Sequence, residues 1–293
     1  MSPRRYRGAD REEKGVTELN RTRIWIVLAF ASVLAAALVA AGCGGDDDDE
    51  VAGGEPNLIK EGEILAATDT PFPPFEIGQP PDNFTGYDPD VFNEVAKRID
   101  LPVEYQDTSF DTIFRDTAQG KFDVAVAAST ITEGRERTVD FSDPYYRANQ
   151  ALTVPKGSDI QTTDDLGGAT VGAQDATTGE AYVQDETDAS EVRGYPEGPD
   201  ALNALRAGQV DAVVIDEPVA EDAVKKFGDL VITQIPTGEL YGFAFAQEND
   251  GLREDVNSAL QEMKDDGTID KLYEKYFKTK PPSQVLEGTH EPS

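Results

Sequence analysis

The chain has 293 residues, and its 57 Asp and Glu outnumber its 26 Lys and Arg, which gives a formal net charge of −31 at pH 7. Such an acidic chain is a poor partner for nucleic acid or anionic lipid, because both carry negative charge. The single cysteine excludes an internal disulfide bond, and the single histidine makes a metal site of the usual Cys and His type implausible. We expect neither a metal nor a cofactor.

The first 42 residues have the pattern of a signal peptide. Arg21 and Arg23 precede an apolar run over residues 24–41, and small residues lead directly to Cys43. A basic region, an apolar region and small residues before a cleavage site are typical of an exported precursor. The segment ending at Cys43 resembles a lipobox, which implies that Cys43 is lipidated and becomes the mature N-terminus. An uncleaved membrane-spanning anchor is the alternative, because the run is long enough to cross a bilayer.

Two terminal segments contain too few apolar residues to form a folded core. Residues 43–57 are mostly Gly, Asp, Glu and Pro, which predicts a flexible acidic tether. Residues 281–293 are also poor in apolar side chains and predict a loose tail, which contains the single histidine, His290. About 220 residues remain between these segments, enough for two lobes of roughly 100 residues each.

The first part of this region alternates predicted strands and helices. Short apolar runs predict strands at 64–68, 103–106 and 124–128. A helix is expected from Asp88 to about residue 99, with Asp88 as its N-cap and Pro89 at its first helical position. A second helix is expected from residue 110 to residue 119.

The second part repeats this alternation. Extended segments are expected at 151–154, 170–173, 192–195, 211–215, 230–234 and 241–246, and helices at 177–184, 199–207, 218–227, 252–265 and 269–277. Alternating strands and helices predict parallel sheets with helices on both faces. We expect two such α/β lobes, joined by two hinge strands at 148–154 and 240–245. Lobe 1 would comprise residues 58–150 and 243–280, and lobe 2 residues 155–239.

The predicted strand at 124–128 runs into a polar segment suited to a small carboxylate. Ser129, Thr130 and Thr132 supply hydroxyl groups, and Arg135 supplies a planar guanidinium that can bind a carboxylate through two hydrogen bonds. The alternative for Arg135 is an ordinary solvated side chain, paired with a neighbouring glutamate.

The stretch from Phe122 to Tyr146 resembles the signature of the bacterial extracellular solute-binding proteins of family 3, the amino-acid-binding components of ABC importers. The resemblance extends over nearly all of residues 63–277. It implies a type II periplasmic-binding-protein fold, whose two lobes close on the ligand through a hinge motion. It also implies an extracytoplasmic lipoprotein, anchored to the outer face of the cell membrane through Cys43. Such a protein would act as a monomer, bind one amino acid and dock on an ABC permease.

The resemblance assigns three side chains of lobe 1 to the body of the ligand. Phe72 and Phe110 would form two aromatic walls, and Asp69 would face the distal end of the ligand. Two aromatic rings make a rigid apolar filter that also accepts a cation. The alternative for Phe72 is a place in the core.

Four further positions of lobe 1 are assigned to the charged backbone of an amino acid. Arg135 would clamp the α-carboxylate, and the segment containing Ala127, Ala128 and Thr130 would meet the amino and carboxylate groups. Many members of the family have Gly where Ala128 stands, so its methyl group is expected to narrow the pocket.

In lobe 2, the segment 174–179 resembles the family's Q-x-G-T-T-G motif, with Ala176 in place of the usual Gly. The resemblance implies that Gln174, Thr177 and Thr178 reach the ligand at the N-terminus of a helix, where backbone N–H groups favour an anion. It implies that Asp216 takes the α-ammonium group. The alternative for Asp216 is a simple helix N-cap.

These assignments favour a polar ligand such as glutamine or a basic one such as arginine. The cyclohexadienyl dehydratases, which resemble this family, leave an enzyme open as an alternative, with Asp69 or Asp216 as the acid or base. No histidine lies in the predicted lobes, so we expect no catalytic residue and a protein that is not an enzyme. A sensor domain on the same fold would need a further span or a fused output domain.

Overall fold

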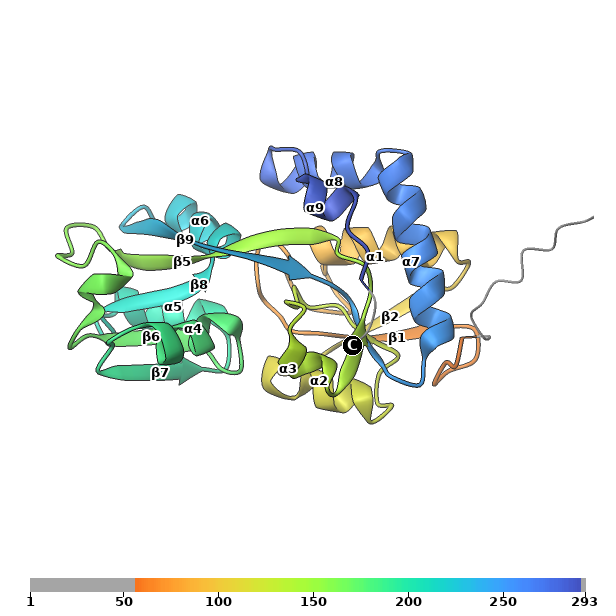
Figure 1. Cartoon of the computed structure of the whole chain (residues 1–293), viewed down its shortest axis with the longest axis horizontal. Helices are drawn as coiled ribbons and strands as arrows, with labels where there is room; N and C mark the ends of the chain where they lie inside the picture. The colour runs from red at the N-terminus through yellow and green to blue at the C-terminus, as the bar shows by residue number, and fades with distance from the viewer. Residues whose placement is uncertain (1–55, 291–293) are drawn as a thin grey trace, which may run out of the picture. The chain divides into compact units, whose positions relative to one another are not determined.

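The computed structural model describes residues 56–290. These residues form two five-stranded sheets flanked by helices (Figure 1). The predicted signal peptide, Cys43 and nearly all of the predicted tether lie outside the described residues. Within residues 56–290, no helix has the length and apolar character needed to cross a membrane.

The sheet of lobe 1 has the strand order β2-β1-β3-β10-β4. Strand β1 is parallel to β2 and β3, whereas β10 runs antiparallel to β3 and β4. Helix α1 packs against α7 and α8, and helix α2 packs against the sheet. The strands are β1 (Ile64–Thr68), β2 (Val103–Asp107), β3 (Val124–Ala125), β4 (Val139–Phe141) and β10 (Ala244–Ala246), and the helices are α1 (Tyr87–Arg98), α2 (Phe110–Ala118), the short α3 (Glu133–Glu136), α7 (Asp250–Asp265) and α8 (Thr268–Phe277).

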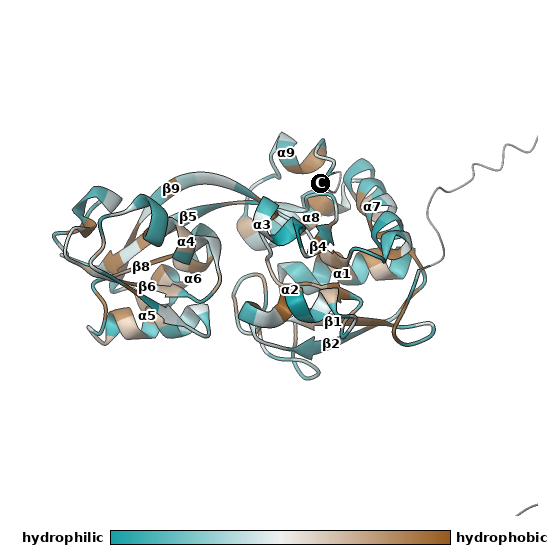
Figure 2. Ribbon diagram, turned by 60° about the horizontal axis from the view of Figure 1, so that its bottom comes forward, coloured by the Kyte–Doolittle hydropathy of each residue, from teal (hydrophilic) through white to brown (hydrophobic). Residues whose placement is uncertain are grey.

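The sheet of lobe 2 has the strand order β7-β6-β8-β5-β9. Strand β6 is parallel to β7 and β8, and all of β8 is buried. Hydrophobic residues colour β6 and β8, whereas the helices of this lobe carry both hydrophobic and hydrophilic residues (Figure 2). The strands are β5 (Tyr146–Pro155), β6 (Thr170–Gln174), β7 (Glu191–Tyr195), β8 (Ala212–Asp216) and β9 (Leu230–Tyr241), and the helices are η1 (Thr163–Leu166), α4 (Thr178–Glu186), α5 (Gly198–Arg206) and α6 (Glu217–Phe227). The predicted fold class, two α/β lobes joined by two hinge strands, is confirmed.

The hinge strands are β5 and β9, which pair antiparallel from Tyr146 opposite Tyr241 to Pro155 opposite Leu230. The sequence predicted an extended segment only at 230–234, but β9 continues to Tyr241, and the segment predicted at 241–246 contains the separate strand β10. Its pairing with β5 shifts register between Ala148 and Gln150, so that residues 236–238 bulge opposite a single residue of β5. The bulge accommodates a proline and a glycine, residues that normally indicate the end of a strand.

Helix α1 begins two residues earlier than predicted, with Gly86 rather than Asp88 as its N-cap. Asp88 therefore does not cap the helix. Its buried carboxylate instead accepts hydrogen bonds from the Ala128 N–H and the Tyr145 hydroxyl, at 2.7 and 2.6 Å. The local sequence predicts an N-cap at Asp88. It gives no sign of the two donors that occupy this carboxylate, because they come from a distant segment of the chain.

Residues 281–290 differ from the loose tail that we expected. They contain the short helix α9 (Ser283–Leu286), whose Val285 is fully buried. The ammonium of Lys264 donates to the Gly288 carbonyl at 3.0 Å, and the His290 Nε2 lies 2.8 Å from Oε1 of Glu136. This part of the tail is therefore packed on lobe 1.

Candidate ligand-binding site

One small cavity lies where the strand ends of the two lobes meet. It is lined by every residue predicted to bind the ligand except Thr178, and also by Glu76; the lining residues are Asp69, Phe72, Glu76, Phe110, Ala127, Ala128, Thr130, Arg135, Gln174, Thr177 and Asp216. In open α/β sheets, ligands bind at the carboxyl ends of the strands. The cavity has a volume of about 20 Å³, which suits a single water molecule. An amino acid can therefore enter only if the lobes separate or the lining side chains move.

Arg135 is placed in the cavity by the short helix α3, whose N-cap Thr132 accepts a hydrogen bond from the Arg135 N–H at 3.2 Å. Its guanidinium donates to the Thr130 carbonyl at 2.7 Å and, across to lobe 2, to the Ala176 carbonyl at 3.3 Å. The guanidinium carbon also lies 5.1 Å from the centre of the Phe110 ring. Burial lowers the pKa of Arg135 to about 10, so the side chain remains a cation at neutral pH. Both of its acceptors are neutral carbonyls.

Asp216 ends β8 and is buried. Although it occupies the N-cap position of α6, its side chain makes no capping bond. Its carboxylate instead accepts hydrogen bonds from the Tyr241 hydroxyl, at 2.6 Å, and from the Gln150 amide. Burial, reinforced by the nearby Glu239 carboxylate, raises the pKa of Asp216 to about 7. A buried carboxylate with a raised pKa gains from a ligand cation.

Asp69 follows β1 and is also buried. Its Oδ2 accepts a hydrogen bond from the Gln174 amide of lobe 2 at 2.7 Å. Burial raises the pKa of Asp69 to about 7, although the Gln174 hydrogen bond opposes this shift. The other oxygen, Oδ1, has no donor among the described residues.

Glu197 adds a second carboxylate near Asp69, from the segment that precedes α5 in lobe 2. Its Oε2 has no donor within residues 56–290. Burial and then the Asp69 carboxylate raise the pKa of Glu197 to about 8. The sequence offered no signal for this residue beyond its place before a helix. Among the described residues, no group of His, Cys, Asp and Glu could hold a metal ion.

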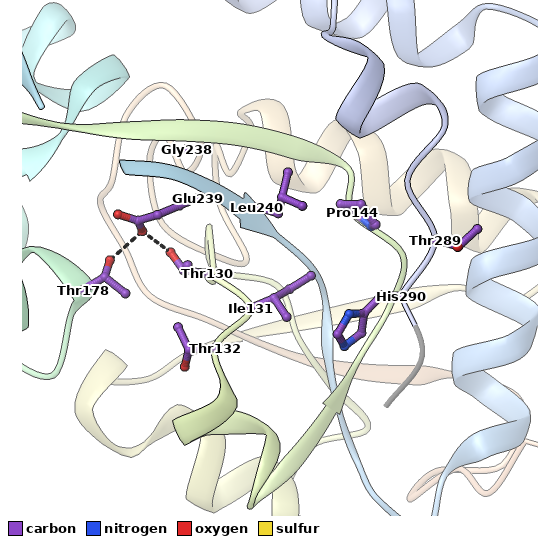
Figure 3. A pocket seen from close by; sticks show the side chains of 10 residues that line it. All are labelled: Thr130, Ile131, Thr132, Pro144, Thr178, Gly238, Glu239, Leu240, Thr289 and His290. Atoms are coloured by element: carbon purple, nitrogen blue, oxygen red, sulfur yellow. Dashed lines mark hydrogen bonds between the residues drawn. The ribbon is translucent and has the colours of Figure 1, made fainter. Parts of the chain in front are cut away.

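Thr178 lies outside the cavity and contributes to a contact between the lobes instead. Its hydroxyl and that of Thr130 both donate to Oε2 of Glu239 at 2.7 Å, as Figure 3 shows. The Gln150 amide donates to the other oxygen of Glu239 at 3.1 Å. Glu239 stands on the hinge strand β9, so one carboxylate holds a hydroxyl from each lobe. Sequence reasoning missed both Glu239 and Gln150, because only the pairing of β5 with β9 brings them to the site.

Thr177 lines the cavity, but its side chain mainly serves helix α4. Its hydroxyl oxygen accepts the Glu180 N–H at 3.1 Å as the N-cap, and the hydroxyl donates to the Gln174 carbonyl at 2.8 Å. The backbone N–H groups of the first turn of α4 therefore remain the anion-binding feature of this segment.

Ala128 and Ala176, which stand where the resemblance implies Gly, both have left-handed backbone conformations, with φ of 42° at Ala128 and 61° at Ala176. An L-residue with a side chain is strained there, whereas glycine is not. Ala176 is exposed, so removing its methyl group removes no packing contacts in the core.

We expect Ala176→Gly to stabilise the unliganded protein by about 0.5–1 kcal/mol, which is a rise in Tm of about 1–4 °C for a protein of this size. Thermal unfolding followed by circular dichroism checks this. Ala173→Gly, in the buried strand β6, is the matched control and should lower the Tm. A lower Tm for Ala176→Gly would contradict the assigned backbone strain.

Comparison with known proteins identifies similar chains over most of the described region. The model of the bacterial extracellular solute-binding proteins, family 3, matches residues 64–279. The L-cystine-binding protein TcyJ of Escherichia coli (strain K12) is 32% identical over 229 residues, which cover 75% of this chain and 85% of that protein.

Two solved structures show the same fold. An ancestral arginine-binding protein bound to glutamine is 39% identical, with a TM-score of 0.71 over 75% of this chain and 100% of the other. The arginine-, lysine-, histidine-binding protein ArtJ from Geobacillus stearothermophilus is 31% identical, with a TM-score of 0.72 over 77% of this chain and 99% of the other. The matches span both lobes and nearly the full length of these proteins.

Proposed function

We propose that this chain, which belongs to the bacterial extracellular solute-binding proteins of family 3, binds a basic L-amino acid between its two lobes and delivers it to an ABC importer. One observation carries the proposal: the half-buried guanidinium of Arg135 and the buried carboxylates of Asp69 and Asp216 line the same cavity. Such a set of charges is complementary to a molecule with one carboxylate and two cationic groups.

The backbone of the amino acid would be held by Arg135 and Asp216. The ligand carboxylate would accept hydrogen bonds from the guanidinium of Arg135. In the unliganded protein these N–H groups donate to neutral carbonyls. Charge-assisted bonds of this kind are stronger than those to a neutral acceptor. The α-ammonium would donate to Asp216, whose burial disfavours a carboxylate without a cation.

The side chain of the ligand would extend between Phe72 and Phe110 toward Asp69 and Glu197. Each of these carboxylates has an oxygen without a donor among the described residues, and a guanidinium or ammonium group would supply the missing N–H bonds. The names of the two structural relatives also refer to arginine, as an arginine-binding protein and an arginine-, lysine-, histidine-binding protein.

We extend the proposal to the location and organisation of the chain. Export would remove residues 1–42, and a lipid on Cys43 would hold the protein at the outer face of the cell membrane, with residues 43–57 as a tether. Lobe 1, residues 58–150 and 243–280, and lobe 2, residues 155–239, would close on the ligand and present themselves together to the permease. The protein would act as a monomer.

The protein would release its ligand unchanged rather than act as a dehydratase. The single histidine of the chain, His290, contacts Glu136 and does not line the cavity. The buried carboxylates of Asp69 and Asp216 accept hydrogen bonds from Gln174 and Tyr241. Binding of a ligand cation accounts for both carboxylates without proton transfer to a substrate.

A thermal-shift panel of the twenty amino acids and cystine tests the proposed function. Arginine and lysine should raise the Tm with increasing concentration, and the bound molecule should be recovered intact. Stabilisation by acidic amino acids alone would overturn the preference for a basic ligand. Conversion of the added molecule into a product would support the enzyme instead.

Asp69→Asn is expected to weaken the binding of L-arginine by about tenfold or more, because one charged hydrogen bond to the side-chain cation is lost. Binding of L-glutamine should change much less, since its amide carries no charge. Isothermal titration calorimetry measures both affinities. Asp111→Asn, at an exposed position in the first turn of α2, is the control. Equal losses for arginine and glutamine would contradict the assigned role of Asp69.

A further inference from the structure

Two carboxyl groups, those of Glu76 and Asp88, come together at the cavity. Both residues are fully buried, and the Asp88 N–H donates to the carbonyl of Phe75, the residue before Glu76, at 3.3 Å. Each carboxyl group shifts the pKa of the other, in part through a side-chain hydrogen bond between them. Glu76 also lines the cavity. Asp88 lies in the first turn of α1, and Glu76 lies in the segment that connects β1 to α1. The pair therefore links this connecting segment to the start of the helix.

The hydrogen bonds of the pair are distributed unequally. Asp88 Oδ2 accepts from the Ala128 N–H at 2.7 Å and from the Tyr145 hydroxyl at 2.6 Å. Asp88 Oδ1 and both oxygens of Glu76 receive no N–H or O–H donor from the described residues. Two adjacent carboxylates cannot both remain ionised in a buried site, so one proton must lie between them.

The proton belongs on Glu76. Asp88 already accepts two hydrogen bonds, which stabilise its ionised form, whereas no donor stabilises an ionised Glu76. The other groups that act on Glu76 are Asp69 and Asp216, and both are acids. Burial and the Asp88 carboxylate accordingly raise the pKa of Glu76 well above its ordinary value. A neutral Glu76 donates its O–H to Asp88 Oδ1 and satisfies the remaining oxygen of Asp88.

The pair acts on the binding site through Ala128. Ala128 has a left-handed conformation, with φ of 42°, and it lines the cavity two residues before Thr130, whose carbonyl holds Arg135. The charge-assisted hydrogen bond that the Ala128 N–H donates to the buried Asp88 carboxylate offsets the strain of this conformation.

We propose that neutral Glu76 and ionised Asp88 form a proton-sharing pair that positions the Ala128 backbone for ligand binding. Both are positioning residues, and Glu76 is not an anion that contacts the cationic ligand. The role in binding rests on the proposed function, whereas the protonation of Glu76 does not.

Infrared difference spectroscopy of the unliganded protein tests the protonation directly. At about pH 9.5, above the pKa of Asp69, Asp216 and Glu197, the wild type should still show the C=O stretch of a protonated carboxyl group. Glu76→Gln should lack this band. A wild-type spectrum without the band would overturn the proton-sharing pair.

Calorimetry with L-arginine tests the positioning role. Glu76→Gln should bind within about threefold of the wild type, because its amide N–H replaces the donated O–H. Asp88→Ala should bind at least about tenfold more weakly, because it releases the Ala128 N–H.

A tenfold loss in folded Glu76→Gln would overturn the positioning role, since that variant keeps a donor to Asp88 and removes only the ability of residue 76 to ionise. Wild-type protein that shows the infrared band but binds no amino acid would overturn the proposed function and the positioning role, but not the proton-sharing pair. Glu76→Gln thus keeps the inference testable even if Asp88→Ala does not fold.

Discussion

Replacing Arg135 with Ala is expected to weaken the binding of L-arginine by about 100-fold or more. The substitution would leave the ligand carboxylate buried without a counterion, and such a loss costs about 3–5 kcal/mol, where each 1.4 kcal/mol is about tenfold in affinity. The variant should fold, because the bonds lost within the protein go only to two backbone carbonyls. Isothermal titration calorimetry measures the affinity, and circular dichroism checks the fold.

Arg137→Ala is the matched control for this experiment. Arg137 lies two residues further along the chain and is exposed, so its loss changes the net charge equally without touching the cavity. We expect it to bind L-arginine as the wild type does. Near-wild-type affinity in Arg135→Ala would show that the carboxylate is held elsewhere.

Asp216→Asn is expected to weaken the binding of L-arginine by about 30-fold or more, because an amide offers the α-ammonium no charge and places an N–H donor in the site. The pH dependence should change as well. Asp216 and Asp69 each have a pKa of about 7, so protons compete with the ligand cations below that pH. Wild-type affinity should fall about tenfold per pH unit, or more steeply if both groups titrate. Asp216→Asn should show a shallower fall.

The same pKa shift has the opposite effect on the stability of the unliganded protein. The pKa of Asp216 rises from the ordinary 3.8 to about 7 on folding, so the folded state binds the proton more tightly. The stability that this proton contributes is fully present below the unfolded pKa and is lost as the pH rises through about 7. Ligand binding and stability should therefore respond to pH in opposite directions.

Calorimetric titration with L-arginine at several pH values between about 5 and 8 measures how the affinity depends on pH, and calorimetric unfolding at the same pH values measures the stability. Asp200→Asn, at an exposed position in the first turn of α5, is the control and should keep both the affinity and the pH dependence of the wild type. A pH-independent affinity in the wild type would rule out Asp216 and Asp69 as the groups that hold the ligand cations.

The candidate site could be predicted where its residues follow predicted strands. Asp69, Gln174 and Asp216 lie at or directly after strand ends, so strand positions and family resemblance were sufficient to bring them together. Arg135 lies instead within the short helix α3, and only the family resemblance assigned it to the site.

Residues that reach the site through long-range pairing could not be predicted in the same way. Glu239 and Gln150 meet only because β5 and β9 pair with a bulge. Asp88 looked like a local N-cap, but its carboxylate is used by Ala128 and Tyr145, far along the chain. Local patterns indicate where a strand or helix lies, whereas they carry little information about which distant donor a carboxylate will meet.

The central claim is that Arg135 and the buried carboxylates together recognise the carboxylate and both cationic groups of a basic amino acid. Calorimetric titration of the wild type with L-arginine and with agmatine, which is arginine without its carboxylate, tests it most directly. L-arginine should bind with a Kd in the micromolar range or below, and agmatine about 100-fold more weakly. Equal binding of the two molecules, or no measurable binding of L-arginine, would contradict the account.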